Sequence, residues 1–190
     1  MSRLIITRAD EVIGALSQQP VVAVLSIEHP GAVPGGKGAA PRLQQPPQLI
    51  LCFWDSEQTV HKGPDLAQVE AGIQFVMEHL EKGDVLIHCH AGKSRSVAIA
   101  LGVLALQYPD HDENKLLEKL LEIRPIAAPN ILIVEMVDVL AGRGGKLLAA
   151  VLNHPQITDQ RQQAEENRQA MLKSHPEIYK KLYPEKFPKP

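Results

Sequence analysis

The sequence predicts an α/β protein, with a small, mainly parallel sheet of four or five strands flanked by helices and then a helical C-terminal half. Three observations predict this fold class. Short apolar runs alternate with helix-like segments through the first half of the chain. The second half contains helix-like segments separated by glycine and proline. The length of 190 residues, 44% of them apolar, suffices for one sizeable core.

Short apolar runs mark the expected strands. They cover residues 4–7, 21–27, 49–54 and 85–88. The second run is apolar apart from Ser26, which is typical of a strand buried on both faces of a parallel sheet. Residues 28–47, between the second and third runs, are dense in proline and glycine, so they predict a long surface loop.

Helices are expected between and after these strands. Residues 8–16 have helical composition, and Asp65 is placed to cap an amphipathic helix that ends before Gly83. Residues 94–107 are apolar almost all round, which predicts a helix at the centre of the domain. In the second half, helices are expected over 114–123 with Asp110 as cap, from 129–130 to near 142, over 146–152 and over 156–173.

The composition changes near residue 154. Residues 1–153 hold 13 basic and 17 acidic side chains, and residues 154–190 hold 7 and 5. We therefore expect one domain over 1–153 and a helical C-terminal extension over 154–190. Aromatic side chains recur every four residues in this extension, which suits packing on the domain, on a second subunit or on another partner, and leaves the oligomeric state open. They are Tyr179, Tyr183 and Phe187.

Charge and cysteine content exclude several classes of protein. The formal net charge is -2, with 22% charged residues, which excludes general disorder and a whole-chain polyanion binder, so no nucleic-acid partner is expected. Two cysteines are too few for a disulfide scaffold or a four-cysteine zinc site. The longest apolar stretch, residues 97–106, reaches half of the roughly 20 residues that a membrane span needs. We expect a cytoplasmic protein without a membrane span, whose thiols stay reduced.

The segment that carries chemistry is residues 88–96, His-Cys-His-Ala-Gly-Lys-Ser-Arg-Ser, between the best strand and the central helix. A tight loop closing onto a helix N-terminus gathers backbone amides into an anion site, which lowers the pKa of Cys89 below the usual 8.5 or so. Gly92 permits the turn, Arg95 can hold two phosphate oxygens, and Ser96 can donate to the sulfur. The phosphate-binding groups are expected on His90, Ala91, Gly92, Lys93, Ser94 and Arg95.

This pattern resembles the His-Cys-x5-Arg-Ser/Thr signature of the cysteine-dependent protein tyrosine phosphatases, including the dual-specificity enzymes. The resemblance covers roughly residues 20–152. It includes Asp55, 34 residues before the cysteine, near where that family keeps its general acid on a mobile loop; Glu57 and Asp65 compete for this role. Arg124-Pro125, Pro129-Asn130 and residues 140–145 are similar to the helical closing segment of compact bacterial members.

The resemblance implies that residues 1–153 form a phosphatase catalytic domain with a phosphotyrosine phosphatase-like fold. The implied reaction is hydrolysis of a phosphate monoester in two steps, without metal or cofactor. Cys89 attacks phosphorus while Arg95 and the loop amides hold the oxygens, Asp55 protonates the leaving group, and Ser96 assists the second step. The implied substrate is protein phosphotyrosine, with dual specificity as a variant.

Three other functions stay open. Arsenate reduction on a related loop would need resolving cysteines, and the single further cysteine, Cys52, argues against it. A phosphoinositide or small-molecule phosphatase would use the same chemistry. Lys93 favours it, because the loop is also similar to that of the phosphoinositide phosphatases, although those usually carry a second lysine where this chain has His90. A non-catalytic phosphate-binding module would be expected to lack the nucleophile, the arginine or the acid. The expected partner is accordingly a phosphorylated protein or a small phosphoester.

Three further side chains near the loop need an interpretation. Cys52 is expected to be a small apolar core residue, and the alternative is a partner that traps oxidised Cys89 as a disulfide. His88 and His90 flank Cys89, but adjacent residues on a strand and a turn point in different directions, so no metal site is expected. His88 is expected to pack behind the loop and to hydrogen-bond it.

Overall fold

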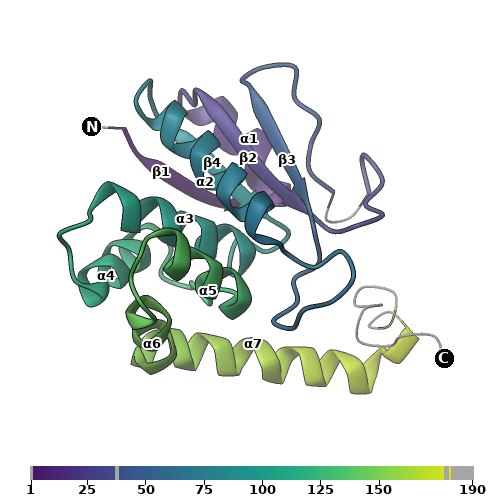
Figure 1. The fold of residues 1–190 in the computed structure, drawn as a ribbon. Helices are drawn as coiled ribbons and strands as arrows, with labels where there is room; N and C mark the ends of the chain where they lie inside the picture. The colour runs from purple at the N-terminus through teal and green to yellow at the C-terminus, as the bar shows by residue number, and fades with distance from the viewer. Residues whose placement is uncertain (1, 37–38, 178–179, 181–190) are drawn as a thin grey trace.

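The computed structural model describes residues 2–36, 39–177 and 180, and it has the predicted α/β architecture (Figure 1). Four strands form one parallel sheet in the order β1-β4-β2-β3. The strands are β1 (Leu4–Arg8), β2 (Ala23–Glu28), β3 (Gln48–Cys52) and β4 (Val85–Cys89). The class, the parallel pairing and the strand number all agree with the sequence-based prediction.

The strand β4 lies inside the sheet, between β1 and β2, and all five of its residues are buried. Its register sets Arg8 of β1 opposite Cys89, and Ser26 of β2 opposite His88. Because parallel strands end at the same edge of a sheet, the C-terminal ends of β1, β4 and β2 meet there. Ligands of open α/β sheets bind at this edge, and Cys89 is the last residue of the central strand.

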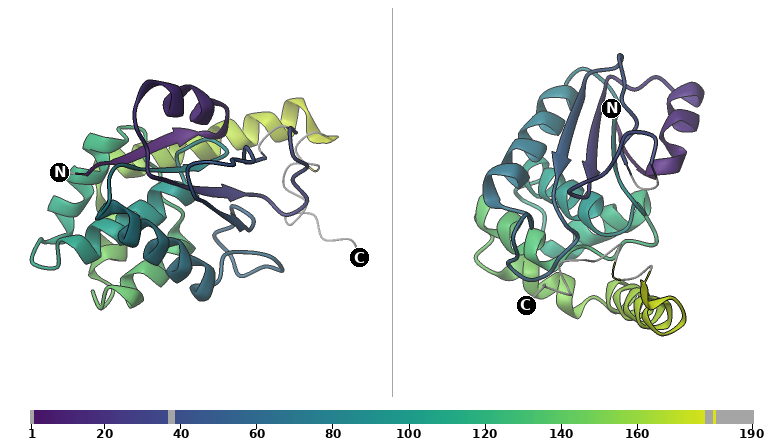
Figure 2. Two further views of the ribbon diagram at one scale, coloured as in Figure 1. Left: turned by 90° about the horizontal axis from the view of Figure 1, so that it is seen from above. Right: turned by 90° about the vertical axis from the view of Figure 1, so that its right-hand side faces the viewer.

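Helices cover both faces of the sheet, as Figure 2 shows with α1 on one side and α2 on the other. On one face, Val12 of α1 packs against Val24 and Leu86; the other face packs against α2 and α3. The helical elements are η1 (Ala9–Glu11), α1 (Val12–Gln18), α2 (Leu66–Leu80), α3 (Arg95–Gln107), α4 (Glu113–Ile123), α5 (Ile131–Leu140), α6 (Lys146–Asn153) and α7 (Pro155–Ser174).

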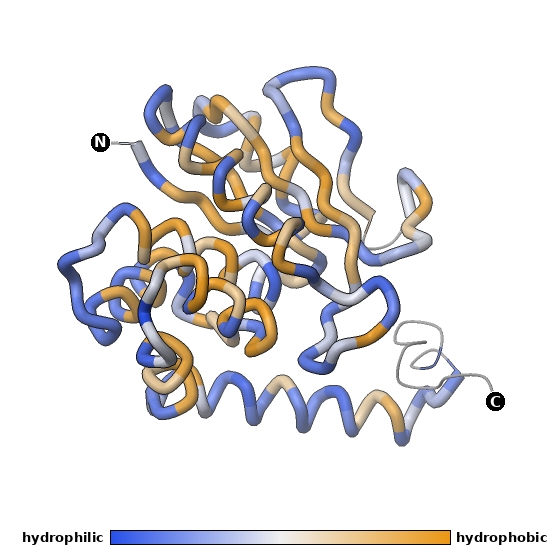
Figure 3. The backbone as a smooth tube through the Cα atoms, in the orientation of Figure 1, coloured by the Kyte–Doolittle hydropathy of each residue, from blue (hydrophilic) through white to orange (hydrophobic). Residues whose placement is uncertain are grey.

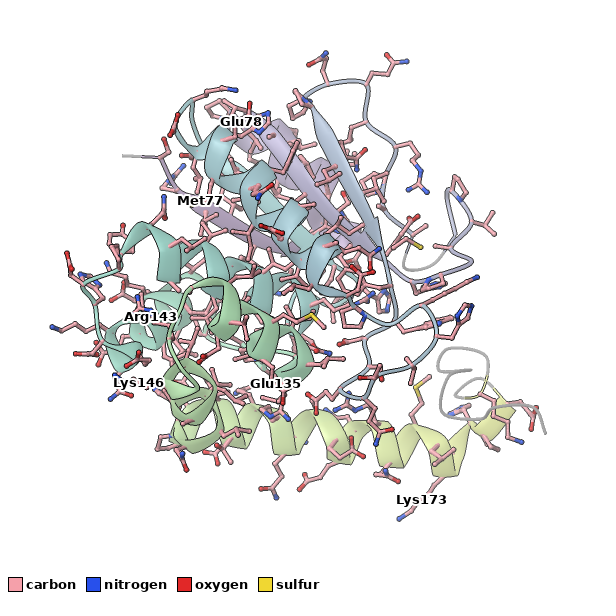
Figure 4. The ribbon with its side chains drawn as sticks, in the orientation of Figure 1. Met77, Glu78, Glu135, Arg143, Lys146 and Lys173 are labelled. Atoms are coloured by element: carbon pink, nitrogen blue, oxygen red, sulfur yellow. The ribbon has the colours of Figure 1, made fainter. Side chains whose placement is uncertain are left out.

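The helix α3 is the centre of the molecule, as its apolar sequence predicts. It is buried from Arg95 to Ala105, and it packs against α2, α4 and α5. A Cβ on Gly102 would lie 2.6 Å from the Ile73 side chain of α2, so the two helices pack so closely that only glycine fits at position 102. Arg143, labelled in Figure 4, donates to the carbonyl of Ala105 in the last turn of α3 and to the carbonyls of Tyr108 and His111 just beyond its end. The loop that precedes α3, residues 90–94, therefore leads into a fully packed helix.

Local details differ from the sequence-based predictions in three places. The cap of α4 is Asp112, which accepts from the Lys115 amide at 2.9 Å, and not Asp110, because an N-cap directly precedes the first helical residue and this helix begins at Glu113. The third strand ends at Cys52 rather than at residue 54. Cys52 is exposed and not a core residue, because alternation along β3 turns Leu51 inward and Cys52 outward.

The last helix, α7, is long and polar, and it runs along the edge of the domain (Figures 1 and 3). It is docked by Ile157, which is fully buried in the core cluster. The expected aromatic repeat, Tyr179, Tyr183 and Phe187, lies outside the described residues. In the described part of the chain, no helix combines the length and the apolar character that crossing a membrane requires.

Candidate active site

The loop between β4 and α3 requires glycine at position 92. Gly92 has φ of 63°, and a Cβ there would collide with the backbone oxygen of Thr7 at the end of β1. The neighbouring strand thus forces the chain into a tight turn directly after Cys89. This turn delivers the chain to the first residue of α3, which is Arg95.

Carbonyl oxygens of this loop are bound by residues outside it. The His90 carbonyl accepts from the Ala9 amide (3.3 Å), and the Gly92 carbonyl accepts from Arg124 Nε (2.9 Å). The Lys93 carbonyl accepts from the Ala128 amide (2.8 Å). In a trans peptide the N–H points opposite to the C=O. The amides that follow these carbonyls therefore point away from the supporting segments, to the open side of the loop. Backbone donors arranged in this way form a site for an oxyanion.

The thiol of Cys89 lies at the base of the loop and is 2% exposed. Its sulfur lies 3.2 Å from Ser96 Oγ, in a hydrogen bond that helps a thiolate. Burial opposes ionisation, as does the charge of Asp55. The charge of Arg95 and the hydrogen bonds from Ser96 outweigh both, so the pKa of Cys89 lies below its ordinary value. The loop favours the nucleophilic form of the sulfur.

The guanidinium of Arg95 is buried, with 4% of the residue exposed. Its Nη1 donates to the Phe53 carbonyl at 2.9 Å, which fixes the plane of the group. Its Nε is fully buried and has no hydrogen-bond acceptor among the described residues, the nearest carboxylate oxygen being Asp55 Oδ2 at 3.9 Å. Such an unmatched donor is costly unless an acceptor occupies the site. An oxyanion above Cys89 supplies that acceptor.

The carboxylate of Asp55 is tied to the same loop. Its Oδ1 accepts from Ser94 Oγ at 2.7 Å and from Asn130 Nδ2 at 2.9 Å. Of the competing acids, Asp65 caps α2 through the Gln68 amide, and Glu57 pairs with an arginine of α7. Asp55 is thus the one acid of these three that the structure joins to the loop.

Asn130 is a site residue that sequence reasoning missed. It was expected only as the start of a helix, and it is indeed the cap of α5, since its Oδ1 accepts from the Ile133 amide at 3.1 Å. Its Nδ2 donates to Asp55 and also to the Ser56 carbonyl at 3.1 Å. Its complete burial leaves no freedom for this amide. A Pro-Asn pair before a helical pattern signals the cap but not the distant carboxylate.

The two histidines beside Cys89 have different surroundings. His88 is buried, its Nε2 lies 2.7 Å from Ser26 Oγ, and burial lowers its pKa to about 4, so its ring is neutral. Its ring therefore bonds β2 through Nε2, and it also lies against the backbone of Cys89 at the base of the loop. His90 is exposed at the mouth of the site. No group of three or more potential metal ligands occurs in the part of the chain that the structure describes.

The distance between the two cysteines bears on the disulfide alternative. Cys52 pairs with Glu28 of β2, and Cys89 follows the residue that pairs with Ser26 of β2. One whole strand thus separates them, which places their Cα atoms about 10 Å apart. A disulfide needs Cα atoms within about 7 Å, so this bond requires movement of the backbone. Both thiols are free in this structure.

A pocket of about 570 Å³ opens above the loop, within the size range of small-molecule sites. Ser94 and Lys93 of the loop line it, together with Asp55. Part of the lining belongs to α7, which the sequence did not indicate as part of the site. The lining residues of α7 are Arg161, Ala164, Asn167, Arg168 and Met171.

Comparison with known proteins identifies the fold. No protein-family model matches the chain, and no curated protein matches its sequence. Solved structures do match. A human tyrosine phosphatase-like serine/threonine/tyrosine-interacting protein has a TM-score of 0.61 at 18% identity, over 74% of this chain and 91% of that one. DUSP15 matches with 0.55 at 18% identity over 87% and 92%, and PTPMT1 in complex with PI(5)P with 0.54 at 17% over 77% and 90%.

The chain therefore has the fold of the cysteine-dependent tyrosine and dual-specificity phosphatases, which confirms the resemblance stated from the sequence. The narrower likeness to bacterial members stays a prediction. One of these matches is named for interaction and phosphatase likeness, so fold alone does not decide between catalysis and binding. The choice between catalysis and binding therefore depends on the residues of the site.

Proposed function

We propose that residues 1–153 form a metal-independent phosphatase domain that hydrolyses phosphate monoesters through a cysteinyl-phosphate intermediate. The observation that supports it most is the convergence of a nucleophile, a cation and an acid on one loop. Cys89 lies beneath the loop, the unmatched Nε of Arg95 lies beside it, and Asp55 accepts a hydrogen bond from Ser94 of the loop itself. A binding module has no use for the acid.

In the first step, the Cys89 thiolate attacks phosphorus and forms a P–S bond while the P–O bond to the leaving alcohol breaks. The loop amides and Arg95 hold the three remaining oxygens, whose charge they balance in the transition state. Asp55, protonated at the start of the cycle, gives its proton to the departing oxygen. The step leaves a free alcohol, a carboxylate on Asp55 and a phosphorylated Cys89.

In the second step, water attacks phosphorus and the P–S bond breaks. Asp55, now a carboxylate, takes a proton from the attacking water and returns to its acid form. The electron pair of the broken bond stays on sulfur, where the hydrogen bond from Ser96 stabilises the thiolate. Inorganic phosphate leaves, and the site is restored.

Protein phosphotyrosine is the proposed substrate, with phosphoserine and phosphothreonine as further substrates of a dual-specificity enzyme. The thiol is almost fully buried beneath a loop whose residues 90, 91, 93 and 94 line the pocket, and a buried nucleophile suits a long, flat phosphotyrosyl side chain. We place the protein in the cytoplasm, because a thiolate nucleophile needs a reducing compartment.

A phosphoinositide or small-molecule phosphatase is the second candidate, and Lys93 is the observation that favours it. Lys93 lines the pocket, and among the described residues it has no carboxylate within ion-pair distance. A free cation there suits a substrate with a second negative charge. The match to PTPMT1 with bound PI(5)P is consistent with this reading.

The test is phosphate release from a panel of phosphotyrosine and phosphoserine peptides, phosphoinositides and small phosphoesters, with and without EDTA. The proposal expects activity that EDTA does not change and that Cys89→Ser abolishes. Activity retained by Cys89→Ser, or lost with EDTA, contradicts the mechanism. Faster release from inositol lipids than from phosphotyrosine peptides favours the second candidate.

A further inference from the structure

The helix α7 is joined to the acid side of the site by one arginine. Arg161 Nη1 donates to Glu57 Oε1 at 2.6 Å, and Nη2 donates to Glu57 Oε2 at 3.0 Å. The same Nη1 also donates to the Pro129 carbonyl at 2.8 Å. A bidentate arginine–carboxylate pair fixes direction as well as distance. We call these three residues, Arg161, Glu57 and Pro129, the Arg161 clamp.

One anchor point of the clamp is near Asp55 itself, and the other is next to a residue that holds Asp55. Glu57 lies two residues after Asp55 on the same loop. Pro129 directly precedes Asn130, whose Nδ2 donates to Asp55 Oδ1 and to the Ser56 carbonyl. The clamp therefore joins the loop that carries the acid to the segment that orients it.

The clamp is not what docks α7 on the domain. Ile157, one turn earlier in the helix, is fully buried in the core, and Gln156 Nε2 donates to the Pro125 carbonyl at 2.8 Å. Arg161 is 24% exposed and Glu57 is 40% exposed, so their ion pair alone contributes little to stability. Its removal should leave the helix in place.

The Nη atoms of Arg161 already have acceptors within the protein. Nη1 donates to Glu57 Oε1 and to the Pro129 carbonyl, and Nη2 donates to Glu57 Oε2. Arg161 lines the pocket but has its guanidinium turned to Glu57 and Pro129, which suits positioning and not contact with the substrate.

We propose that Arg161 is a positioning residue for the general acid, and that α7 is in this way a working part of the active site. The inference rests on the proposed role of Asp55. A proton donor must lie within hydrogen-bond distance of the leaving oxygen in the transition state, and small misplacements are expensive in rate. The clamp holds Asp55 at that position from outside the phosphate loop.

The test compares the wild-type chain with the variants Arg161→Ala, Arg161→Lys and Glu57→Gln. The substrates are aryl phosphates whose leaving groups range from good to poor. A good leaving group departs without help from an acid, and a poor one needs it. For the poorest leaving group, we expect Arg161→Ala and Glu57→Gln to lower kcat about tenfold, with KM unchanged. For the best leaving group, we expect kcat within about twofold of wild type. Arg161→Lys should recover part of the loss.

The control is Lys173→Ala, on the same helix but directed away from the domain (Figure 4), which should behave as wild type. In an Asp55→Ala background, Arg161→Ala should cause no further loss, because the acid that it positions is gone. Equal losses for all leaving groups, a change confined to KM, or full additivity with Asp55→Ala would overturn the inference. Activity that survives Cys89→Ser instead refutes the proposed function, so the two failures are distinguishable.

Discussion

The side of the site that carries the proposed nucleophile, Cys89, and the side that carries the proposed acid, Asp55, are built in different ways. We call them the nucleophile side and the acid side. The loop with Cys89 and Arg95 is one continuous segment, held by backbone hydrogen bonds and by a glycine that no other residue replaces without collision. The acid Asp55 is held by side chains from distant segments, namely Ser94 and Asn130, 39 and 75 residues away. A local motif specifies the first side, and tertiary contacts specify the second. We therefore expect the acid side to be the more adjustable of the two.

Among the variants that test this comparison, Asp55→Ala is expected to change kcat the most. Loss of a general acid lowers kcat by about 10²–10⁴ for poor leaving groups and far less for good ones. The measurement is kcat for two aryl phosphates, one with a good and one with a poor leaving group. An unchanged kcat on the poor leaving group would give the role of acid to another group, with Glu57 as the next to test.

Gly92→Ala tests how rigid the nucleophile side is. The new Cβ meets the Thr7 backbone, so the loop must shift, and a shift of the amides by about 1 Å costs on the order of 10²-fold in rate. The loss should be equal for good and poor leaving groups, unlike that of Asp55→Ala. Gly144→Ala is the matched control, because Gly144 also has a positive φ but a Cβ there meets nothing within 4 Å. Wild-type rates in Gly92→Ala would show that the loop tolerates displacement.

Asn130→Ala removes one contact to the acid and the cap of α5 together. We expect kcat on poor leaving groups to fall about tenfold, and the free energy of unfolding to fall by about 1 kcal/mol from the lost cap. Asn130→Ser keeps a capping oxygen but cannot reach Asp55 in the same way, so it should restore stability more than rate. Thermal unfolding and kcat measured on both variants separate the two roles. Parallel recovery of both quantities would show that Asn130 is only a cap.

Ser96→Ala has the smallest expected effect. The hydrogen bond from Ser96 stabilises the Cys89 thiolate, so its removal raises the pKa of Cys89 toward the ordinary value. The rate of alkylation by iodoacetate, followed against pH, reports this pKa directly. For wild type, the half-point should lie below the usual 8.5 or so, and Ser96→Ala should move it to higher pH. A half-point that does not move would leave Arg95 as the main cause.

The sequence predicts the nucleophile side almost completely. Its strand, glycine, arginine and helix lie within a few residues, and local spacing determines their geometry. The strand pattern also predicts the parallel sheet, and the caps of α2 and α5 follow from single side chains. Errors occur where a choice is local but ambiguous, such as Asp110 against Asp112 as the cap of α4, or where strand alternation turns Cys52 outward.

The acid side is predicted only in part, for a physical reason. Asp55 is singled out only through the resemblance to the tyrosine phosphatases, which keep their general acid near this position. Nothing in the sequence pairs it with Asn130 or pairs Glu57 with Arg161, 104 residues away. Those contacts depend on how α5 and α7 pack. The sequence of a polar helix such as α7 predicts how long the helix is. It does not predict which face of the helix packs against the site, because it has no apolar stripe.

The most direct test of the account is to trap the intermediate. An aryl phosphate with a good leaving group is mixed with the wild-type chain, the reaction is quenched with denaturant at neutral pH within milliseconds, and the phosphorylated residue is located by mass spectrometry of the peptides. We predict a phosphoryl group on Cys89 sulfur, more of it in Asp55→Ala, where hydrolysis of the intermediate is slowed, and none in Cys89→Ser. A phosphoryl group on His88 or His90, or turnover without any phosphorylated enzyme, would contradict it.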